Sequence, residues 1–194
     1  MTGRHFLLEG VDLSGKSSAI SGIRLKNHKL HYQHSSIVAN NPILDVAKLI
    51  KKDGSEWIGH LYAEAVKWDI DHYQKPIGTV LQDSTTLLRS LAFHAAAGYA
   101  SVVEKLEALV PSFPKFDKVY VLTASINARR ARLIRRQSVD GARVTANDLK
   151  VINDPQFFKR MDDALIDYAD TIFGAEVIDT SNMTPQEVID AIEV

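Results

Sequence analysis

The segment Glu9–Ser18, "EGVDLSGKSS", carries the strongest signal for the fold of this protein. From Gly10 to Ser17 it matches the pattern GxxxxGK[ST], which is typical of loops that wrap around phosphate groups. Gly10 and Gly15 give access to backbone conformations that other residues rarely adopt, so the chain can curl around an anion. The loop amides and the start of the following helix then point at the phosphate.

The chemistry of the loop can be divided among its residues. Lys16 can reach the β- and γ-phosphates of a nucleoside triphosphate, and the Ser17 hydroxyl can bind Mg²⁺. A chance match is disfavoured because an apolar run, Arg4–Gly10, precedes the loop and a helical pattern, Lys16–Asn27, follows it. The predicted nucleotide-binding residues of the loop are Gly10, Asp12, Leu13, Ser14, Gly15, Lys16, Ser17 and Ser18.

Composition narrows the class of protein. The chain has 194 residues, 45% of them hydrophobic, and a net charge of -1 from 23 basic and 24 acidic residues. This balance gives no general attraction to nucleic acid polymers or to anionic membranes. The absence of cysteine excludes disulfides, thiolate metal sites and cysteine catalysis. No apolar run has the length of a signal peptide or a membrane span, so we expect a cytoplasmic protein.

Strand and helix patterns alternate along the whole chain, without a linker or a repeat. This order predicts one domain, residues 1–194, with a parallel sheet covered by helices on both faces. The expected strands are Arg4–Gly10, Lys29–Ser35, Gly78–Ser84, Lys118–Ser125 and Ala175–Ser181. The expected helices are Lys16–Asn27, Asn41–Lys52, Ser55–Gln74, Thr85–Val110, Ile126–Gln137, Asp154–Ile172 and Thr184–Val194.

The longer string "FLLEGVDLSGKSS" resembles the opening of thymidylate kinases and the related deoxynucleoside kinases. Weaker similarities follow in the family's order along nearly the whole chain. They are "LYAEAVKWDIDHY" (61–73), "VLQDS" with "SLAFH" (80–94), "YVLTASINARRARLIRR" (120–136), "FFKRMDDALIDYAD" (157–170) and "VIDTSNMTPQEVIDAI" (177–192). Only the loop motif is specific by itself, and the order of the other matches adds the remaining support.

The resemblance implies a P-loop NTPase fold, in which three α/β/α layers enclose a five-stranded parallel sheet. It also implies a helical lid with arginines, about residues 126–150, that closes over ATP. ATP and Mg²⁺ are the implied cofactors, and a small molecule is the phosphate acceptor. Related kinases are often dimers, so the long helix expected at Thr85–Val110 is a possible homodimer surface.

The acceptor side departs from the family. Asp83-Ser84-Thr85 stands where the family has Asp-Arg-Tyr, and Ala65-Val66 stands where thymidylate kinases have Asp-Arg. Both missing arginines help the family to hold the acceptor's monophosphate. Without such cations, two phosphates repel each other at short range. These differences favour a hydroxyl group as the acceptor. In the loop itself, Leu13 replaces a glycine.

The carboxylates Asp83 and Asp12 are candidates for catalysis. Asp83 ends a predicted strand at the sheet edge where ligands bind, so it can hold Mg²⁺ or accept a proton from the acceptor. Its alternative role is to cap the following helix. Asp12 lies inside the loop, where it either faces the acceptor or the metal, or only orients the loop backbone.

Four arginines lie within two turns of the expected lid helix, and Arg129, Arg132 and Arg136 share one face. The resemblance implies that Arg132 and Arg136 act on the phosphoryl group and that Arg129 contacts ATP. The alternative is a solvated basic face. On the acceptor side, we expect contributions from Trp57, Glu64 and Arg89.

The leading prediction is a kinase that transfers the γ-phosphate of ATP to a nucleoside-like hydroxyl acceptor. A thymidylate-type kinase of nucleoside monophosphates and a kinase of a non-nucleotide metabolite or antibiotic are alternatives. A different class, a non-catalytic switch protein that binds nucleoside triphosphates, is also compatible with the loop. The arginine-rich lid favours phosphoryl transfer over this last class.

Overall fold

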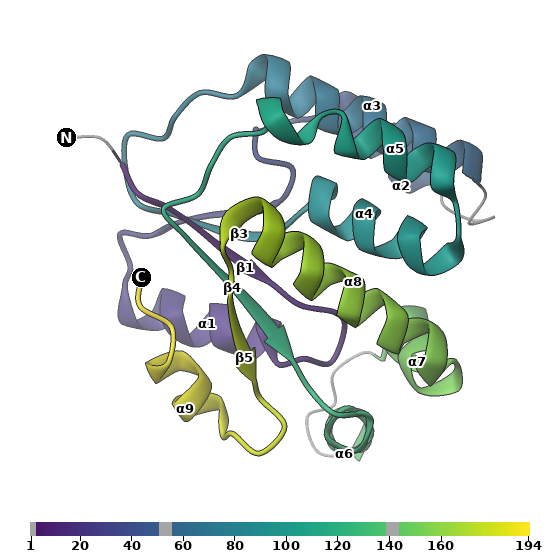
Figure 1. Ribbon diagram of the computed structural model, residues 1–194. Helices are drawn as coiled ribbons and strands as arrows, with labels where there is room; N and C mark the ends of the chain where they lie inside the picture. Colours follow the sequence, from purple (N-terminus) through teal and green to yellow (C-terminus); the bar gives the residue numbers. More distant parts are fainter. Residues whose placement is uncertain (1–2, 51–55, 139–143) are drawn as a thin grey trace.

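The computed structural model describes residues 3–50, 56–138 and 144–194. Their centre is a parallel sheet of five strands in the order β2-β3-β1-β4-β5 (Figure 1). The strands are His5–Glu9 (β1), His31–Ser35 (β2), Val80–Thr85 (β3), Lys118–Thr123 (β4) and Glu176–Asp179 (β5). They confirm the predicted five-stranded parallel sheet, and the most central strand, β1, is the one that leads into the phosphate loop.

Helices flank the sheet on both faces. They are Lys16–Lys26 (α1), Pro42–Ile50 (α2), Glu56–His72 (α3), Thr86–Ala97 (α4), Ala100–Glu107 (α5), Ile126–Ser138 (α6), Ala146–Asn153 (α7), Pro155–Phe173 (α8) and Pro185–Asp190 (α9). In Figure 1, α1 and α9 lie on one side of the sheet, while α4 and α8 cover the other side with α3 and α5 beyond them. The three predicted layers are therefore present.

Successive side chains of β1 point to opposite faces of the sheet and contribute to the hydrophobic core on both. Phe6 and Leu8 pack with residues of α1 and α9 on one side of the sheet, and Leu7 packs with α4 and α8 on the other. All three side chains are fully buried, as expected for a strand in the middle of a parallel sheet. Burial of β1 on both faces fixes the position from which the phosphate loop leaves the sheet.

The helix predicted over Thr85–Val110 is wrong as a single element. It is divided into α4 and α5 at Gly98, which has φ 79° and ends α4 in the left-handed conformation. Its apolar pattern comes from packing inside the protein, since Leu87, Leu88 and Leu91 are fully buried. The expected homodimer surface on this helix stays a prediction.

Two further local expectations are corrected. Thr85, and not Asp83, caps α4, because its hydroxyl accepts a hydrogen bond from the Leu88 amide at 3.2 Å. The cap shifts because β3 continues through Ser84, whose φ of 61° accompanies a bulge against β2. The sequence analysis also missed α7, which begins with a capping box formed by Thr145 and Asp148.

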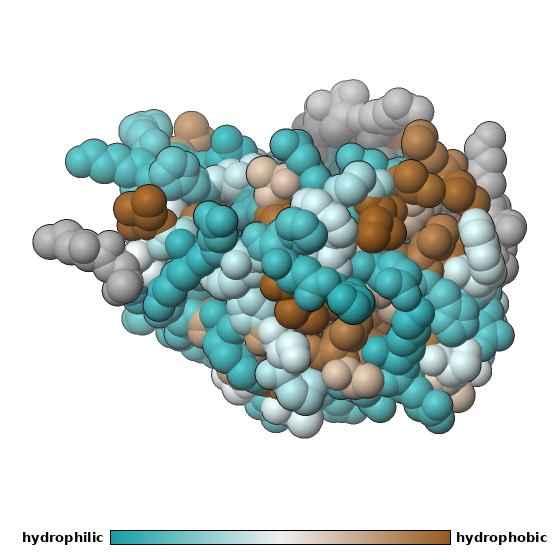
Figure 2. All heavy atoms as spheres, turned by 90° about the horizontal axis from the view of Figure 1, so that it is seen from above, coloured by the Kyte–Doolittle hydropathy of each residue, from teal (hydrophilic) through white to brown (hydrophobic). Residues whose placement is uncertain are grey.

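The outer face over α3 and α5 is mainly hydrophilic, with hydrophobic residues gathered toward one end (Figure 2). Four exposed large hydrophobic side chains come from the end of α2 and the start of α3, namely Val46, Leu49, Ile50 and Trp57. Within the described ranges, no helix is long and apolar enough to cross a membrane.

Candidate active site

The phosphate loop runs from the carboxyl end of β1 to the start of α1, and its backbone shape depends on three unusual residues. Gly10, Leu13 and Gly15 have φ angles of 151°, 65° and 97°. A Cβ on Gly10 would lie 2.5 Å from the Leu122 carbonyl oxygen, so only glycine fits there. Leu13 adopts the left-handed conformation without being glycine, at a cost of roughly 1 kcal/mol.

The loop encloses a cavity that fits phosphate groups and Mg²⁺. Residues 11–18 line it, together with Arg136 and Asp148. The buried Ser14 hydroxyl has no hydrogen-bond partner among the described residues, and the side chain of Ser17 is exposed at the first turn of α1. A helix N-terminus, a lysine and unused hydroxyls are the groups that bind phosphate. Hydroxyl and carboxylate oxygens suit Mg²⁺, so Ser17 and Asp83 are suitable ligands.

Asp83 lies beside Lys16, as its predicted place at the strand end implies. Lys16 Nζ forms an ion pair with Asp83 Oδ1, and the Tyr32 hydroxyl donates to Asp83 Oδ2 at 2.8 Å. His34 Nε2 lies 3.9 Å from the same oxygen. The ends of β2 and β3 thus bring a carboxylate, a phenol and an imidazole to the lysine of the phosphate loop. Sequence reasoning missed Tyr32 and His34, because only the strand register places them there.

The pKa of His34 depends on the charged groups around this end of the sheet. Burial lowers its pKa, and Lys16, Lys48 and Arg89 lower it further, whereas Asp83 acts in the opposite direction. Three cations from α1, α2 and α4 therefore act on one half-exposed imidazole. The lowered pKa favours the neutral form of this side chain.

Glu9 is fully buried beneath the phosphate loop. Its Oε1 accepts a hydrogen bond from the Thr85 amide at 2.6 Å, so it joins the end of β1 to the start of α4. Burial raises the pKa of Glu9, although Arg89 and Lys16 act to lower it. The sequence placed Glu9 at the strand end but did not indicate this role.

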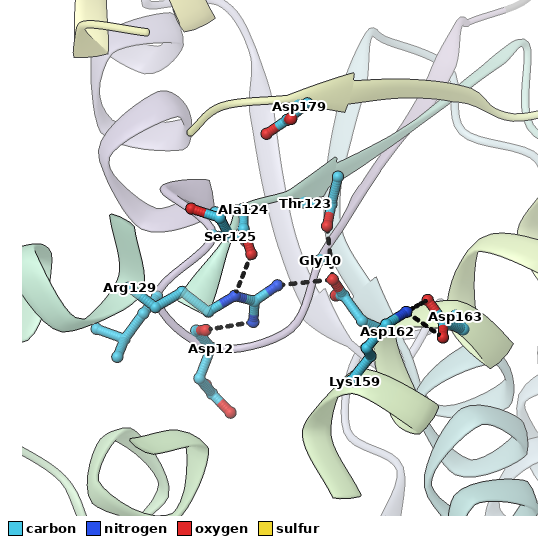
Figure 3. Close-up of polar contacts among 12 residues, drawn as sticks. Gly10, Asp12, Thr123, Ala124, Ser125, Arg129, Lys159, Asp162, Asp163 and Asp179 are labelled. Carbon is cyan, nitrogen blue, oxygen red and sulfur yellow. Dashed lines mark hydrogen bonds and ion pairs between the residues drawn. The ribbon is translucent and has the colours of Figure 1, made fainter. Parts of the chain in front are cut away.

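Arginine side chains contact the phosphate loop through its carbonyl groups. Arg89 donates to Gly10 O, Arg129 to Asp12 O and Arg132 to Leu13 O, each at 2.9 Å. Figure 3 shows Arg129 between the loop and α8. Arg132 also donates to Thr180 O at 2.6 Å. Arg129 and Arg132 therefore bind the loop from outside, and their predicted contacts with ATP stay predictions.

Among the described residues of the expected lid, Arg136 lines the cavity, while positions 139–143 lie outside the described residues. Its Nη1 lies 2.9 Å from Asp148 Oδ1 of α7, and this carboxylate is buried. Asp12 is half-buried within the loop, with Oδ2 3.6 Å from Arg89 Nη2. Both residues thus lie at the phosphate loop, each with a partner of opposite charge, and their roles at a phosphate group stay predictions.

The predicted acceptor residues of α3 have different surroundings. Trp57 is 55% exposed in the first turn, and Glu64 forms an ion pair with Lys105 of α5 at 2.6 Å. Their roles stay predictions. The same helix carries a group that the sequence analysis missed, because buried Asp69 accepts hydrogen bonds from Ser36 Oγ at 2.6 Å and from Asn41 Nδ2 at 2.7 Å.

Solved structures of kinases share this fold. Thymidylate kinase from Candida albicans matches with a TM-score of 0.67 at 15% identity, over 98% of this chain and 89% of that chain. A deoxyadenosine kinase from M. mycoides with bound dATP matches with a TM-score of 0.61 at 15% identity, over 96% of this chain and 96% of that chain. Thymidylate kinase from Ehrlichia chaffeensis matches with a TM-score of 0.62 at 13% identity, over 98% of this chain and 96% of that chain.

These matches confirm the P-loop kinase fold, and they are consistent with a P-loop phosphotransferase. At such low identity the likeness establishes the fold alone. No protein-family model matches the sequence, and no curated protein matches it significantly.

Proposed function

We propose that this protein is a kinase that transfers the γ-phosphoryl group of ATP to a hydroxyl group of a nucleoside-like small molecule. The observation that carries the proposal is the complete phosphate loop, with Lys16 paired to Asp83 of the neighbouring strand β3. In the reaction the acceptor oxygen bonds to the γ-phosphorus, the bond from that phosphorus to ADP breaks, and the proton of the hydroxyl is released to solvent.

The protein contributes position and charge. Lys16 stabilises the transferring phosphoryl group, and Arg136 adds a second cation from the lid. Ser17 and Asp83 would hold Mg²⁺, and the ion would supply charge neutralisation at the phosphates. We assign Asp83 to the metal rather than to proton removal, because carboxylate oxygens are preferred ligands of Mg²⁺.

The pairing of the cation Arg89 favours a hydroxyl acceptor over a phosphate acceptor. Arg89 stands closest to the loop on this side, but its guanidinium binds Gly10 O and lies 3.6 Å from the Asp12 carboxylate. Because this hydrogen bond holds Arg89 to the loop backbone, its guanidinium is less available to a second phosphate group. Solved kinases of this fold include a thymidylate kinase and the M. mycoides deoxyadenosine kinase, whose structure holds dCMP and dCDP as products.

A nucleoside monophosphate is the second candidate acceptor, and Lys48 is the observation in its favour. This residue of α2 adds a cation near His34, on the side of the sheet away from β4. A monophosphate acceptor would use it as a counter-charge, whereas a neutral hydroxyl would not. Lys48→Met therefore separates the two candidates.

The test is ATP consumption in the presence of Mg²⁺ and a panel of nucleosides, nucleoside monophosphates and amino sugars. We expect a nucleoside to stimulate turnover well above basal hydrolysis, and Lys48→Met to leave that turnover within about twofold. Lys16→Ala should abolish transfer while the circular dichroism spectrum is retained, because it removes the charge from the transferring group.

Two results would count against the proposal. If no acceptor stimulates turnover, the protein is a nucleotide-binding switch rather than a kinase. If only monophosphates stimulate it, and Lys48→Met raises the KM for them about tenfold or more, the second candidate is correct.

A further inference from the structure

Arg129 is buried between the phosphate loop, β4 and α8, with only 4% of its surface exposed. All three nitrogens of its guanidinium group donate hydrogen bonds (Figure 3). Nε donates to Ala124 O at 2.8 Å, Nη1 to Asp12 O at 2.9 Å and Nη2 to Asp162 Oδ2 at 2.8 Å. Three of the five N–H groups of the guanidinium are thus used within the protein, and burial of the side chain leaves the other two little access to a ligand.

The loop contact lies beside the one strained residue of the loop that is not glycine. Asp12 O belongs to the peptide group that precedes Leu13, and Leu13 O belongs to the peptide group that follows it. Arg129 binds the first and Arg132 binds the second, each at 2.9 Å. Two arginines thus hold both peptide planes around a leucine with φ 65°.

Holding a carbonyl also sets the direction of an amide. The C=O and N–H of a trans peptide point in opposite directions, so the bond to Asp12 O turns the Leu13 N–H away from Arg129. The amides of such a loop are the groups that bind phosphate. A change in the peptide at Asp12–Leu13 would therefore change the donors that the loop presents.

The position of Arg129 is itself fixed by a second set of contacts. Asp162 of α8 balances its charge at 2.8 Å, and the Thr123 hydroxyl of β4 donates to the same carboxylate oxygen. This arrangement gives a rigid support in the described structure. By contrast, neighbouring Arg130 is exposed.

We propose that Arg129 is a positioning residue, which holds the phosphate loop in its anion-binding shape and so offsets the backbone strain of Leu13. This inference rests on the proposed function in one respect, namely that the loop binds the phosphates of ATP. It assigns the arginine to the protein backbone rather than to the nucleotide. A glycine at position 13 would adopt the same backbone angles without strain, and would reduce the need for the arginine.

The test is a set of variants whose affinity for Mg²⁺·ATP is measured by calorimetry and whose unfolding is measured in urea. Arg129→Met should weaken binding about tenfold or more, and Arg129→Met with Leu13→Gly should recover most of that loss. Arg129→Met with Leu13→Ala should not recover it, because alanine removes the buried side chain but keeps the Cβ that makes φ 65° costly. Arg130→Met is the control on the same helix and should bind like the wild type.

Equal binding by the glycine and alanine double variants would overturn the proposal, since the arginine would then act on the nucleotide or only on folding. Arg129→Lys serves if Arg129→Met does not fold, because lysine retains a charge beside Asp162 but lacks the planar fork. If the wild type does not bind ATP, the proposed function fails. The positioning role of Arg129 is then judged from the free energy of unfolding alone. Arg129→Met must lower this free energy less in the Leu13→Gly protein than in the Leu13→Ala protein. Equal decreases in the two proteins would refute the role.

Discussion

His5 is buried at the start of β1, where its ring meets the edge of the Phe116 ring with centroids 4.6 Å apart. Burial lowers the pKa of His5 to about 4, although Gln82 and Asp117 favour the charged form. Between about pH 6.5 and pH 4, the unfolded chain binds a proton at this site and the folded protein does not. The stability that neutral His5 provides is therefore present above this range and is lost as the pH falls through it.

We predict that the free energy of unfolding of the wild type falls more than that of His5→Phe when the pH is lowered from 7.5 to 4.5. The expected difference is about 2 kcal/mol, measured by urea unfolding at both pH values. Burial raises the pKa of Glu9 and Asp69, which gives the opposite pH dependence, but both proteins share these groups. Parallel pH profiles for the two proteins would refute the role given to His5.

The sequence could predict individual residues where their function is local. Lys16 and Ser17 follow from a motif of eight positions, and Asp83 follows from its place at a strand end. The contacts of Arg129 and Arg132 could not be predicted, because the carbonyl groups that they bind lie 117 and 119 residues earlier in the chain. A run of arginines on a helix specifies a charge, but tertiary packing decides what that charge contacts.

Helix α3 holds the segment between β2 and α2 through Asp69. This carboxylate accepts hydrogen bonds from the Ser36 hydroxyl, the Ile37 amide and the Asn41 amide group. Asn41 in turn accepts from the amides of the first turn of α2, so one aspartate fixes both the segment and the helix start. Without the Asp69 carboxylate, the segment after β2 and the start of α2 would lose the hydrogen-bond acceptor that they share.

We predict that Asp69→Ala lowers the free energy of unfolding by roughly 3 kcal/mol, because it leaves buried donors without an acceptor. Asp71→Ala is a matched control on the same helix, since Asp71 pairs with Lys67 at the exposed surface and should contribute little. Urea unfolding of both variants provides the comparison. A similar small effect in both would show that the buried hydrogen bonds do not anchor the segment.

Elements were predictable where one periodicity dominates the sequence, and less so where two signals compete. The apolar spacing of Thr85–Val110 predicts one helix, but Gly98 ends α4 in a conformation with φ 79° that favours glycine. Helix α7 spans only eight residues, so its apolar pattern is short, although Thr145 and Asp148 form a readable capping pair. In both places, the boundary of the helix depends on its capping residues and not on the spacing of apolar residues.

The fold class followed from the alternation of strands and helices, but the strand order did not. Alternation requires parallel strands joined by crossovers, and leaves open which strands are neighbours. The order β2-β3-β1-β4-β5 arises because β1 is buried on both faces and takes the central place. This order brings Tyr32 and His34 beside Asp83, which explains why those two residues escaped the sequence analysis.

If the loop binds ATP, binding should stabilise the whole molecule by mass action. At an ATP concentration of about 100 times Kd with Mg²⁺, the gain is roughly 2.7 kcal/mol, which corresponds to a rise in Tm of roughly 5 to 10 °C for a protein of this size. Differential scanning fluorimetry measures this rise. Lys16→Ala should melt without it, and a rise of the same size in Lys16→Ala would place the binding elsewhere.

The supports of the phosphate loop have a consequence for the time course of folding. The loop is formed by residues 10–17, but the groups that hold it arrive much later in the chain: Arg129 and Arg132 in α6, and Thr180 after β5, whose hydroxyl donates to Ser14 O at 2.7 Å. The local sequence can nucleate α1 early, whereas the anion-binding shape must wait for contacts of long sequence separation. A chain emerging from the ribosome therefore carries its nucleotide motif from the beginning and becomes competent to use it only when the far end of the sheet has docked.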